Sequence, residues 1–333
     1  MVRGNRQDER PTFRGGFSGR GRGGGNRIYS RGRYTVDLSR NDYMIDIGSN
    51  LTSKKFDKQI DGIIDRAYKK KVKMQIVTGT DLKNSKEAYD LTKHPRYGNI
   101  LRSTVGIHPH YASNFNKKTY DIFREMLKND YENKIVAVGE TGLDYYRMIS
   151  PMNDQKESFR QHIQLAIEFN KPLFLHERDA HHAFIKILDE FKGKLPPVVV
   201  HCFTGKGKEL EAYVQRGFYI GITGFIAIEH RSQTTQKCIK KLPLDRLMIE
   251  TDAPYMKPSK SPETPTGCME PSLLYLVAMK LAKLYGVKPE VITEHATRNT
   301  KKFFGLDNTK ENLETNVGRF KLEFIEPKPL EEV

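Results

Sequence analysis

The sequence predicts an α/β protein with a (β/α)8 barrel that follows a disordered, Arg/Gly-rich N-terminal tail. Two observations support this prediction. From residue 43 onward, eight short apolar runs alternate with helix-like segments, and strands buried on both faces read as continuous apolar runs. Four of the runs also end on an acid or a histidine, where the strands of such a barrel would open onto one face.

The predicted strands succeed one another at the spacing of β/α units. They span residues 44–48, 73–79, 100–107, 135–140, 172–176, 197–202, 218–224 and 246–251. Two predicted helices have a clear apolar face, over residues 154–169 and 271–285, and Pro271 is well placed to open the second. A doubly wound open sheet is the alternative, but no Gly-rich fingerprint follows the first strand.

Composition divides the 333 residues into a low-complexity tail over 1–40, the barrel over 43–305 and a charged extension over 306–333. The net charge is +15, and residues 1–34 hold nine Arg against Asp8 and Glu9, which gives +7 there and leaves 15 − 7 = +8 elsewhere. Both parts favour a polyanionic partner, although surface lysines also serve solubility.

The Arg/Gly tail buries too little apolar surface to offset its chain entropy, so we expect disorder. Such segments bind nucleic acid through charge and guanidinium stacking. A nucleic acid, DNA or RNA, is therefore the expected partner of the tail. A solubilising tail and a mitochondrial presequence are the open alternatives.

Neither a membrane span nor secretion is indicated. No apolar stretch approaches the ~20 residues of a membrane helix, and the N-terminus lacks the apolar region of a signal peptide. The three cysteines, Cys202, Cys238 and Cys268, are widely spaced and odd in number, which favours a reducing compartment. We expect a cytoplasmic or nuclear location, with mitochondria as the alternative.

Four ligand-type residues close predicted strands: Glu140, His176, His201 and Asp252. A buried strand has no reason of its own to finish on an acid or an imidazole. Because the strand ends of a barrel meet at one mouth, these side chains can converge although they are far apart in the sequence. Carboxylates and imidazoles are ligands for a divalent cation that activates water. The pattern therefore predicts a metal-dependent hydrolase.

The chain also resembles a known family from about residue 43 to residue 305. The stretches that carry the resemblance are DIGSNL at 46–51, GIHPH at 106–110, GETGLD at 139–144, LHERDAH at 175–181, HCFTG at 201–205 and IETDAPY at 249–255. Together they are similar to the TatD-type deoxyribonucleases of the metal-dependent hydrolase superfamily. The resemblance implies a TIM-type barrel and metal-dependent hydrolysis of DNA phosphodiesters, typically by an exonuclease that prefers single strands and serves DNA repair or DNA degradation.

By position, the resemblance implies that Glu140, His176, His201 and Asp252 hold the metal. Glu140 would bridge two cations if two bind. Asp252 also resembles the residue that orients or deprotonates the attacking water, and a carboxylate beside a cation suits that work. The catalytic residues expected are thus Asp252 and Glu140.

The first strand departs from many relatives in the superfamily, which begin with Asp-x-His-x-His. Gly48 and Asn50 stand where those histidines would be, as in the TatD subgroup. Fewer imidazoles shift the expected preference from Zn²⁺ toward Mg²⁺ or Mn²⁺, with one or two ions. Asp46 and Asn50 are either further ligands, direct or through water, or residues that close the first strand and cap the next turn.

Five other residues are candidates near this mouth. His108 and His110 would face a phosphate oxygen or the leaving group, or else fix their loop by hydrogen bonds. Arg178 is a phosphate candidate because its planar fork matches phosphate oxygens, with an ion pair to a neighbouring acid as the alternative. Asp144 would support a ligand, and Tyr255 would stack on a base or pack within its loop.

Two other functions fit the sequence. The same scaffold hosts amidohydrolases and lactonases that act on small substrates, because the fold does not fix the substrate. The barrel could also be inactive while the Arg/Gly tail binds nucleic acid, and such binding would fall steeply with salt.

Overall fold

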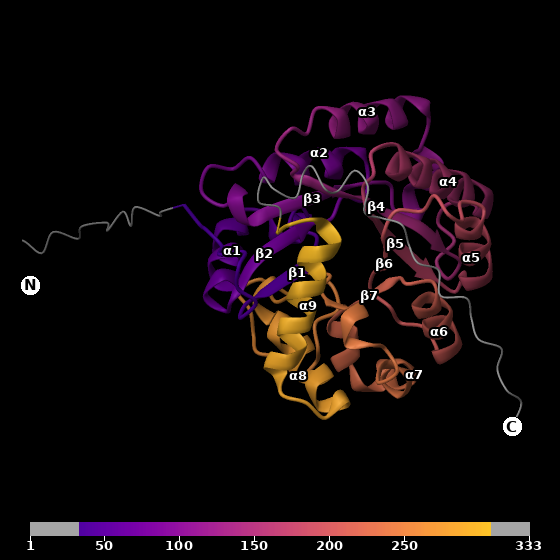
Figure 1. Ribbon diagram of the computed structural model, residues 1–333. Helices are drawn as coiled ribbons and strands as arrows, with labels where there is room; N and C mark the ends of the chain where they lie inside the picture. The colour runs from indigo at the N-terminus through magenta and orange to yellow at the C-terminus, as the bar shows by residue number, and fades with distance from the viewer. Residues whose placement is uncertain (1–32, 308–333) are drawn as a thin grey trace, which may run out of the picture. The chain divides into compact units, whose positions relative to one another are not determined.

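The computed structural model describes residues 33–307, and they form a barrel of eight parallel strands surrounded by helices (Figure 1). The strands pair in the order β1 to β8 along the chain, so the predicted (β/α)8 barrel is confirmed. They are β1 (Met44–Ser49), β2 (Val72–Val77), β3 (Leu101–Val105), β4 (Ile135–Asp144), β5 (Leu173–Arg178), β6 (Val198–Val200), β7 (Tyr219–Ile222) and β8 (Leu247–Ile249).

A helix follows each strand, and two follow the last. The helices are α1 (Ile60–Lys69), α2 (Leu82–Leu91), α3 (Lys117–Lys128), α4 (Met152–Glu168), α5 (His181–Asp189), α6 (Gly207–Gln215), α7 (Glu229–Ile239), α8 (Leu274–Tyr285) and α9 (Pro289–Phe304). Short 3-10 turns complete the loops: η1 (Lys54–Phe56), η2 (Gly98–Ile100), η3 (Pro109–Asn114), η4 (Gly224–Ala227), η5 (Leu244–Arg246) and η6 (Pro271–Leu273). Within residues 33–307, no helix is long and apolar enough to cross a membrane.

The first and last strands meet where the barrel opens. A parallel bridge joins Ser49 to Ala253, and the backbone N–H of Asp252 donates to the carbonyl of Gly48 at 2.8 Å. The backbone N–H of Asn50 donates to the carbonyl of Ala253 at the same distance. These contacts close the barrel at the C-terminal ends of its strands, where barrel enzymes carry their active sites.

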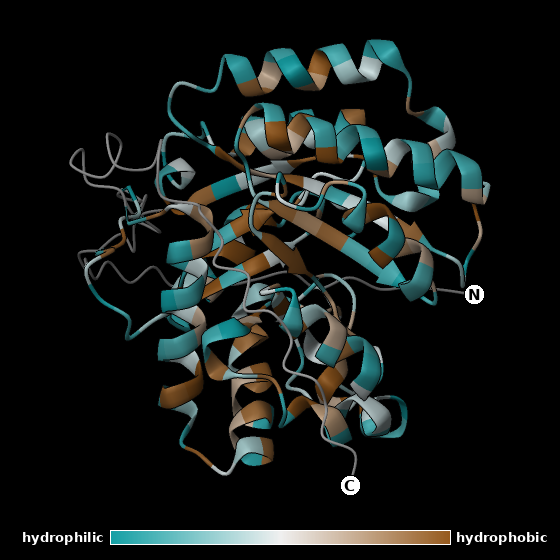
Figure 2. Cartoon of the chain, turned by 45° about the vertical axis from the view of Figure 1, so that its right-hand side comes forward, coloured by the Kyte–Doolittle hydropathy of each residue, from teal (hydrophilic) through white to brown (hydrophobic). Residues whose placement is uncertain are grey.

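The strands carry runs of apolar residues, coloured brown in Figure 2, and many of these residues form one buried cluster. Buried side chains from alternate positions fill the barrel interior, including Ile45, Ile47 and Met248. Phe303 and Phe304 of α9 belong to the same cluster and pack against Tyr219 and Tyr43 at the start of the strands. The interior is therefore a packed core that supports the mouth from below.

Several predicted boundaries were wrong, for identifiable reasons. β4 continues past Glu140 because residues 141–144 pair with residues 175–178 of β5, so Glu140 and His176 lie within their strands rather than at their ends. Strands β6, β7 and β8 are shorter than expected. Pro271 opens the 3-10 turn η6, and α8 begins after it.

The two ends of the chain lie largely outside the described residues. The predicted disorder of the tail falls there for residues 1–32, as does the extension from residue 308. Within the described part of the predicted tail, the Tyr34 ring packs on the Tyr68 ring, with centroids 4.6 Å apart. Arg96 donates a hydrogen bond to the Tyr34 hydroxyl at 3.0 Å. The last tail residues thus contact the barrel.

A buried histidine on α4 fixes the backbone that leads to the mouth. His162 accepts a hydrogen bond from the Ile107 backbone N–H at 3.1 Å, one residue before His108. Its Nδ1 lies 2.7 Å from the carbonyl oxygen of Ser158, to which it donates. Only the neutral imidazole can make both bonds, and burial lowers the pKa of His162 from 6.5 to about 4.

This linkage predicts a pH-dependent stability. Between the folded pKa near 4 and the unfolded pKa near 6.5, the unfolded chain binds the proton and the folded chain does not. Stability should therefore be full above pH 6.5 and fall as the pH drops, by up to about 3 kcal/mol at pH 4. Urea unfolding of the wild type and of His162→Asn across this range measures the contribution. Equal pH slopes in the two proteins would contradict it.

Candidate active site

Four histidines and four acids gather where β3 to β6 and β8 open. They come from the loop after β3, from within β4 and β5, and from the residues directly after β6 and β8. These residues are His108, His110, Glu140, Asp144, His176, His201, Glu250 and Asp252. The four predicted ligands are thus brought to the same mouth, and the predicted His108, His110 and Asp144 lie with them.

The Glu140 carboxylate lies at the centre of this group. Its Oε1 lies 2.8 Å from His201 Nε2, 2.9 Å from His176 Nδ1 and 3.2 Å from His108 Nε2. The donor atoms of His108, Glu140 and His176 all fall within 4.8 Å of one another. Three imidazoles from three segments therefore converge on one carboxylate oxygen.

Gly139 accounts for the local conformation at Glu140. Its φ is +146°, and a Cβ there would overlap the carbonyl oxygen of Phe174 on β5. Only glycine permits this close approach of the two strands. The Gly139–Glu140 peptide is cis. The Phe174 ring also stacks on His201, with centroids 4.6 Å apart, so the barrel core holds this imidazole from below.

The electrostatics of the group favour positive charge. Burial alone would raise the pKa of Glu140, but His201 and His108 hold that pKa well below its ordinary value. Burial would likewise lower the pKa of His201, yet Glu140 and Glu250 raise it well above 6.5. A site that ionises its carboxylate and retains protons on its imidazoles is one whose field also attracts a divalent cation.

Asp144, at the end of β4, contacts two imidazoles of the group, those of His110 and His176. Its Oδ2 lies 2.9 Å from His110 Nε2 and 3.4 Å from His176 Nε2. Although burial opposes it, these contacts lower the pKa of Asp144. Its Oδ1 accepts the backbone N–H groups of Tyr146 at 3.0 Å and Arg147 at 2.8 Å. The carboxylate therefore connects the site to the loop after β4.

Asp252 differs from the other acids in its ionisation. Burial raises its pKa to about 7, His201 opposes that shift, and Glu140 adds to it. Asn50 donates to Asp252 Oδ1 from Nδ2 at 3.1 Å. Asp252 can thus exchange a proton near neutral pH while one of its oxygens is held in place.

Asp46 lies apart from the imidazoles and joins β1 to the end of β8. Its Oδ1 accepts the backbone N–H of Thr251 at 2.9 Å, and its Oδ2 accepts the Thr251 hydroxyl at 2.5 Å. These bonds match the expected alternative in which Asp46 closes the first strand.

Glu250 is the functional-site residue that the sequence reasoning missed. It is fully buried, its Oε1 accepts the Cys202 backbone N–H at 2.6 Å, and its Oε2 lies 3.4 Å from His201 Nδ1. A Cβ at Gly48 or at Gly221 would overlap this carboxylate. The signal was present in the sequence, because Glu250 directly follows the apolar run of β8 and precedes Asp252 by two residues.

Of the four predicted substrate-binding residues, Arg178 and Tyr255 lie outside the cluster of acids and imidazoles. Arg178 ends β5, and its guanidinium stacks over the Tyr146 ring, 3.9 Å from the centroid. The ion pair considered as its alternative is absent from the described residues, since Glu177 instead accepts bonds from Tyr213 and from the backbone of Ala180. Tyr255 is half exposed, beside Lys55.

The donors present fit a divalent cation. The group offers imidazole nitrogens and carboxylate oxygens, the usual ligands for zinc, manganese and magnesium. His176 Nε2 is buried without a hydrogen bond in the described part of the chain, although Asp144 Oδ2 lies 3.4 Å away. Such a nitrogen is positioned to coordinate an ion.

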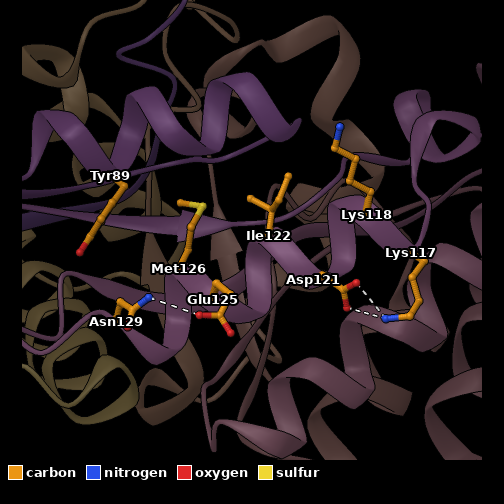
Figure 3. Close-up of a pocket in the computed structure, with 8 residues that line it drawn as sticks. All are labelled: Tyr89, Lys117, Lys118, Asp121, Ile122, Glu125, Met126 and Asn129. Carbon is orange, nitrogen blue, oxygen red and sulfur yellow. Dashed lines mark hydrogen bonds and ion pairs between the residues drawn. The ribbon is translucent and has the colours of Figure 1, made fainter.

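A separate hollow of about 820 Å³ lies on the outer surface between α2 and α3 (Figure 3). Tyr89, Ile122 and Met126 give it an apolar wall, and Lys117 pairs with Asp121 at 2.7 Å on its edge. Its lining contains no histidine and belongs to helices rather than to the barrel mouth. The clustered acids and imidazoles are therefore the candidate active site, and this hollow lies apart from them.

Comparisons with known proteins cover the same region. The family model described as TatD related DNase matches residues 45–305. The 3′-5′ ssDNA/RNA exonuclease TatD of Escherichia fergusonii is 38% identical over 264 residues, which are 79% of this chain and 99% of that protein. The protein of the same name from Salmonella typhimurium is 36% identical over 78% of this chain and 98% of its own length.

Solved structures agree with the sequence relatives. The TatD homologue YJJV from Escherichia coli K12 superposes with a TM-score of 0.73 at 26% identity, covering 80% of this chain and 99% of its own. The TatD family hydrolase from Entamoeba histolytica shares the fold with a TM-score of 0.71 at 24% identity, over 79% of this chain and 98% of its own. The chain therefore belongs to the TatD family of metal-dependent DNases.

Proposed function

We propose that this chain removes nucleotides from the 3′ end of single-stranded DNA, and of RNA, by metal-dependent hydrolysis. The observation that carries the proposal is the convergence of three imidazoles on Glu140 beside an acid that titrates near neutral pH. The relatives named as 3′-5′ ssDNA/RNA exonucleases match the chain across the whole barrel, which supports both the polarity and the choice of substrate.

Glu140, His176, His201 and Asp252 are the proposed metal ligands, and His108 joins them because its Nε2 lies 3.2 Å from Glu140 Oε1. The metal, when bound, lowers the pKa of water and offsets the negative charge of the phosphate. Glu140 presents the central oxygen to which the imidazoles are directed. The mixture of carboxylates and imidazoles supports Mg²⁺ or Mn²⁺ and also accommodates Zn²⁺.

Asp252 is the proposed general base. Its pKa near 7 lets it accept the proton of the attacking water and release that proton at physiological pH. Asn50 holds one of its oxygens, which orients the carboxylate for this transfer. His110 Nε2 lies 2.9 Å from Asp144 Oδ2 and positions that carboxylate next to the His176 ring.

Arg178 and Tyr255 are the proposed contacts to the nucleic acid outside the reacting bond. The Arg178 guanidinium can take phosphate oxygens from the plane of its fork, because its stacking on Tyr146 uses only its face. The nine arginines of residues 1–34 support further, sequence-independent capture of DNA or RNA. The unpaired cysteines support a cytosolic or nuclear location.

Loss of the general base should remove activity without unfolding the protein. We expect Asp252→Asn to lower kcat on a 5′-end-labelled single strand by at least about 100-fold, since general-base catalysis is worth about that much or more. The matched control is Asp245→Asn, whose carboxylate is two-thirds exposed outside the site. Denaturing gels with Mg²⁺, Mn²⁺ or Zn²⁺, and with EDTA, measure the rate. Normal turnover of Asp252→Asn would contradict the assignment.

Metal binding should also be visible without catalysis. A ligand that binds only the folded state raises Tm, and at 100 times its Kd adds about 2.7 kcal/mol, or roughly 5–10 °C for a domain of this size. We expect Mn²⁺ to raise the Tm of the wild type but not that of Glu140→Gln. Glu263→Gln, at a side chain 92% exposed, should keep the rise. An equal rise in Glu140→Gln would exclude Glu140 as a ligand.

A further inference from the structure

Three exposed tyrosines surround the active site. Tyr111 is 44% exposed, Tyr146 is 61% exposed and Tyr255 is 50% exposed. They belong to the segments that follow β3, β4 and β8, the strands whose ends supply His108, Asp144 and Asp252. An aromatic ring left in water next to a catalytic site indicates a binding surface rather than a packing role.

Each tyrosine is tied to the site through its own backbone. The N–H of Tyr111 donates to the carbonyl of His108 at 2.8 Å, and the N–H of Tyr255 donates to the carbonyl of Asp252 at 2.9 Å. The N–H of Tyr146 donates to the Asp144 carboxylate at 3.0 Å. The backbone of each tyrosine is therefore fixed relative to the residues of the site, and each side chain is at least 44% exposed.

Cations accompany two of the rings. Arg178 stacks on Tyr146 at 3.9 Å from the centroid, and Lys55 lies over Tyr255 at 5.3 Å. Among the described residues the Arg178 guanidinium has no ion-pair partner, so this stacking is its principal contact. A positive charge beside an aromatic face is the arrangement that binds a nucleobase and its phosphate together.

The rings lie on two parts of the rim. Tyr111 is near the metal group, with its ring centroid 6.4 Å from that of His108. Tyr255 borders the same group, since it follows Asp252 by three residues and its backbone N–H donates to the Asp252 carbonyl. Tyr146 lies on the other part of the rim, in the loop after β4, where its ring contacts Arg178 at the end of β5.

A second groove leads away from the mouth, but its charge does not favour binding of a nucleic-acid strand. A groove of about 940 Å³ runs from Tyr111 between α1 and α2. Two of its lysines are already paired with acids of the same groove, Lys83 with Glu87 at 3.7 Å and Lys93 with Asp90 at 3.2 Å. The lining holds four acids against three lysines, so it offers phosphates no net positive charge, whereas the Tyr146 side carries the Arg178 guanidinium.

The geometry points to two nucleobase-stacking platforms on either side of the scissile phosphate. Tyr146, backed by Arg178, forms one platform, and Tyr111 beside Tyr255 forms the other. This inference rests on the proposed function, because it assigns the residues that hold the substrate for that reaction. Stacking needs an exposed base face, which a duplex does not offer, and it tolerates any base and either sugar. The platforms thus select single strands of DNA or RNA.

The test is equilibrium binding by the full chain in EDTA. One short single strand carries the fluorescent base 2-aminopurine at its 3′-terminal positions, and a second is identical but abasic there. We expect Tyr146→Ala and Tyr111→Ala each to weaken binding of the first strand about tenfold and to leave binding of the abasic strand unchanged. Tyr146→Phe should bind both strands like the wild type, because the ring is retained.

The matched control is Tyr131→Ala, since Tyr131 is 90% exposed but precedes β4, at the opposite end of the barrel. It should bind both strands like the wild type. The inference would be overturned if the alanine variants bound both oligonucleotides equally more weakly than the wild type. It would also be overturned if the wild type bound the two oligonucleotides equally well or bound neither. Metal-dependent cleavage by the wild type is followed in parallel. Failure to cleave either strand would contradict the proposed function, whereas the binding result decides the inference on its own.

Discussion

The closure of the barrel between β1 and β8 is the constraint on which the active site depends. Asp46 accepts both polar hydrogens of Thr251, and the backbone of Asp252 bonds to Gly48 on the neighbouring strand. Because Asp252 follows β8 whereas His108 and Glu140 come from β3 and β4, these groups can face one another only if the sheet is closed. A buried carboxylate is a costly way to close a sheet unless it is fully hydrogen-bonded, as Asp46 is.

The site concentrates charge that a folded protein would otherwise avoid. Glu140, Glu250 and His201 are buried, and the His201 imidazole lies between the two carboxylates, 2.8 Å from Glu140 and 3.4 Å from Glu250. Removing one member would leave its partners without compensation, so these residues form a unit rather than a set of independent contributions. The same interdependence gives the group its chemistry, because a negative field that retains protons on imidazoles also binds a divalent cation.

The fold and the main members of the site could be predicted because apolar runs and the residues that end them are local features of the sequence. The eight runs gave the barrel, and Glu140, His176, His201 and Asp252 do meet at its mouth. The extension of β4 could not be predicted, since it depends on pairing with β5 across a long stretch of chain.

Two features of the site could not be predicted from the sequence, for the same kind of reason. His108 was expected either to face the substrate or to fix its loop by hydrogen bonds, and its contact with Glu140 arises from a loop conformation that depends on His162 and on the turn of η3. The position of Glu250 after an apolar run is visible in the sequence, but the space that Gly48 and Gly221 leave for its side chain depends on other strands. In both cases the decisive neighbours are distant in the chain.

The fit of Glu250 against Gly48 also limits how this enzyme can be re-engineered. A designer who wished to install the Asp-x-His arrangement of other metal-dependent hydrolases would place an imidazole at position 48, where the Glu250 carboxylate already lies. A side chain at that position requires Glu250 to move, and Glu250 is itself held by Cys202 and His201. The two metal-site architectures are therefore separated by at least two simultaneous changes on opposite sides of the barrel seam.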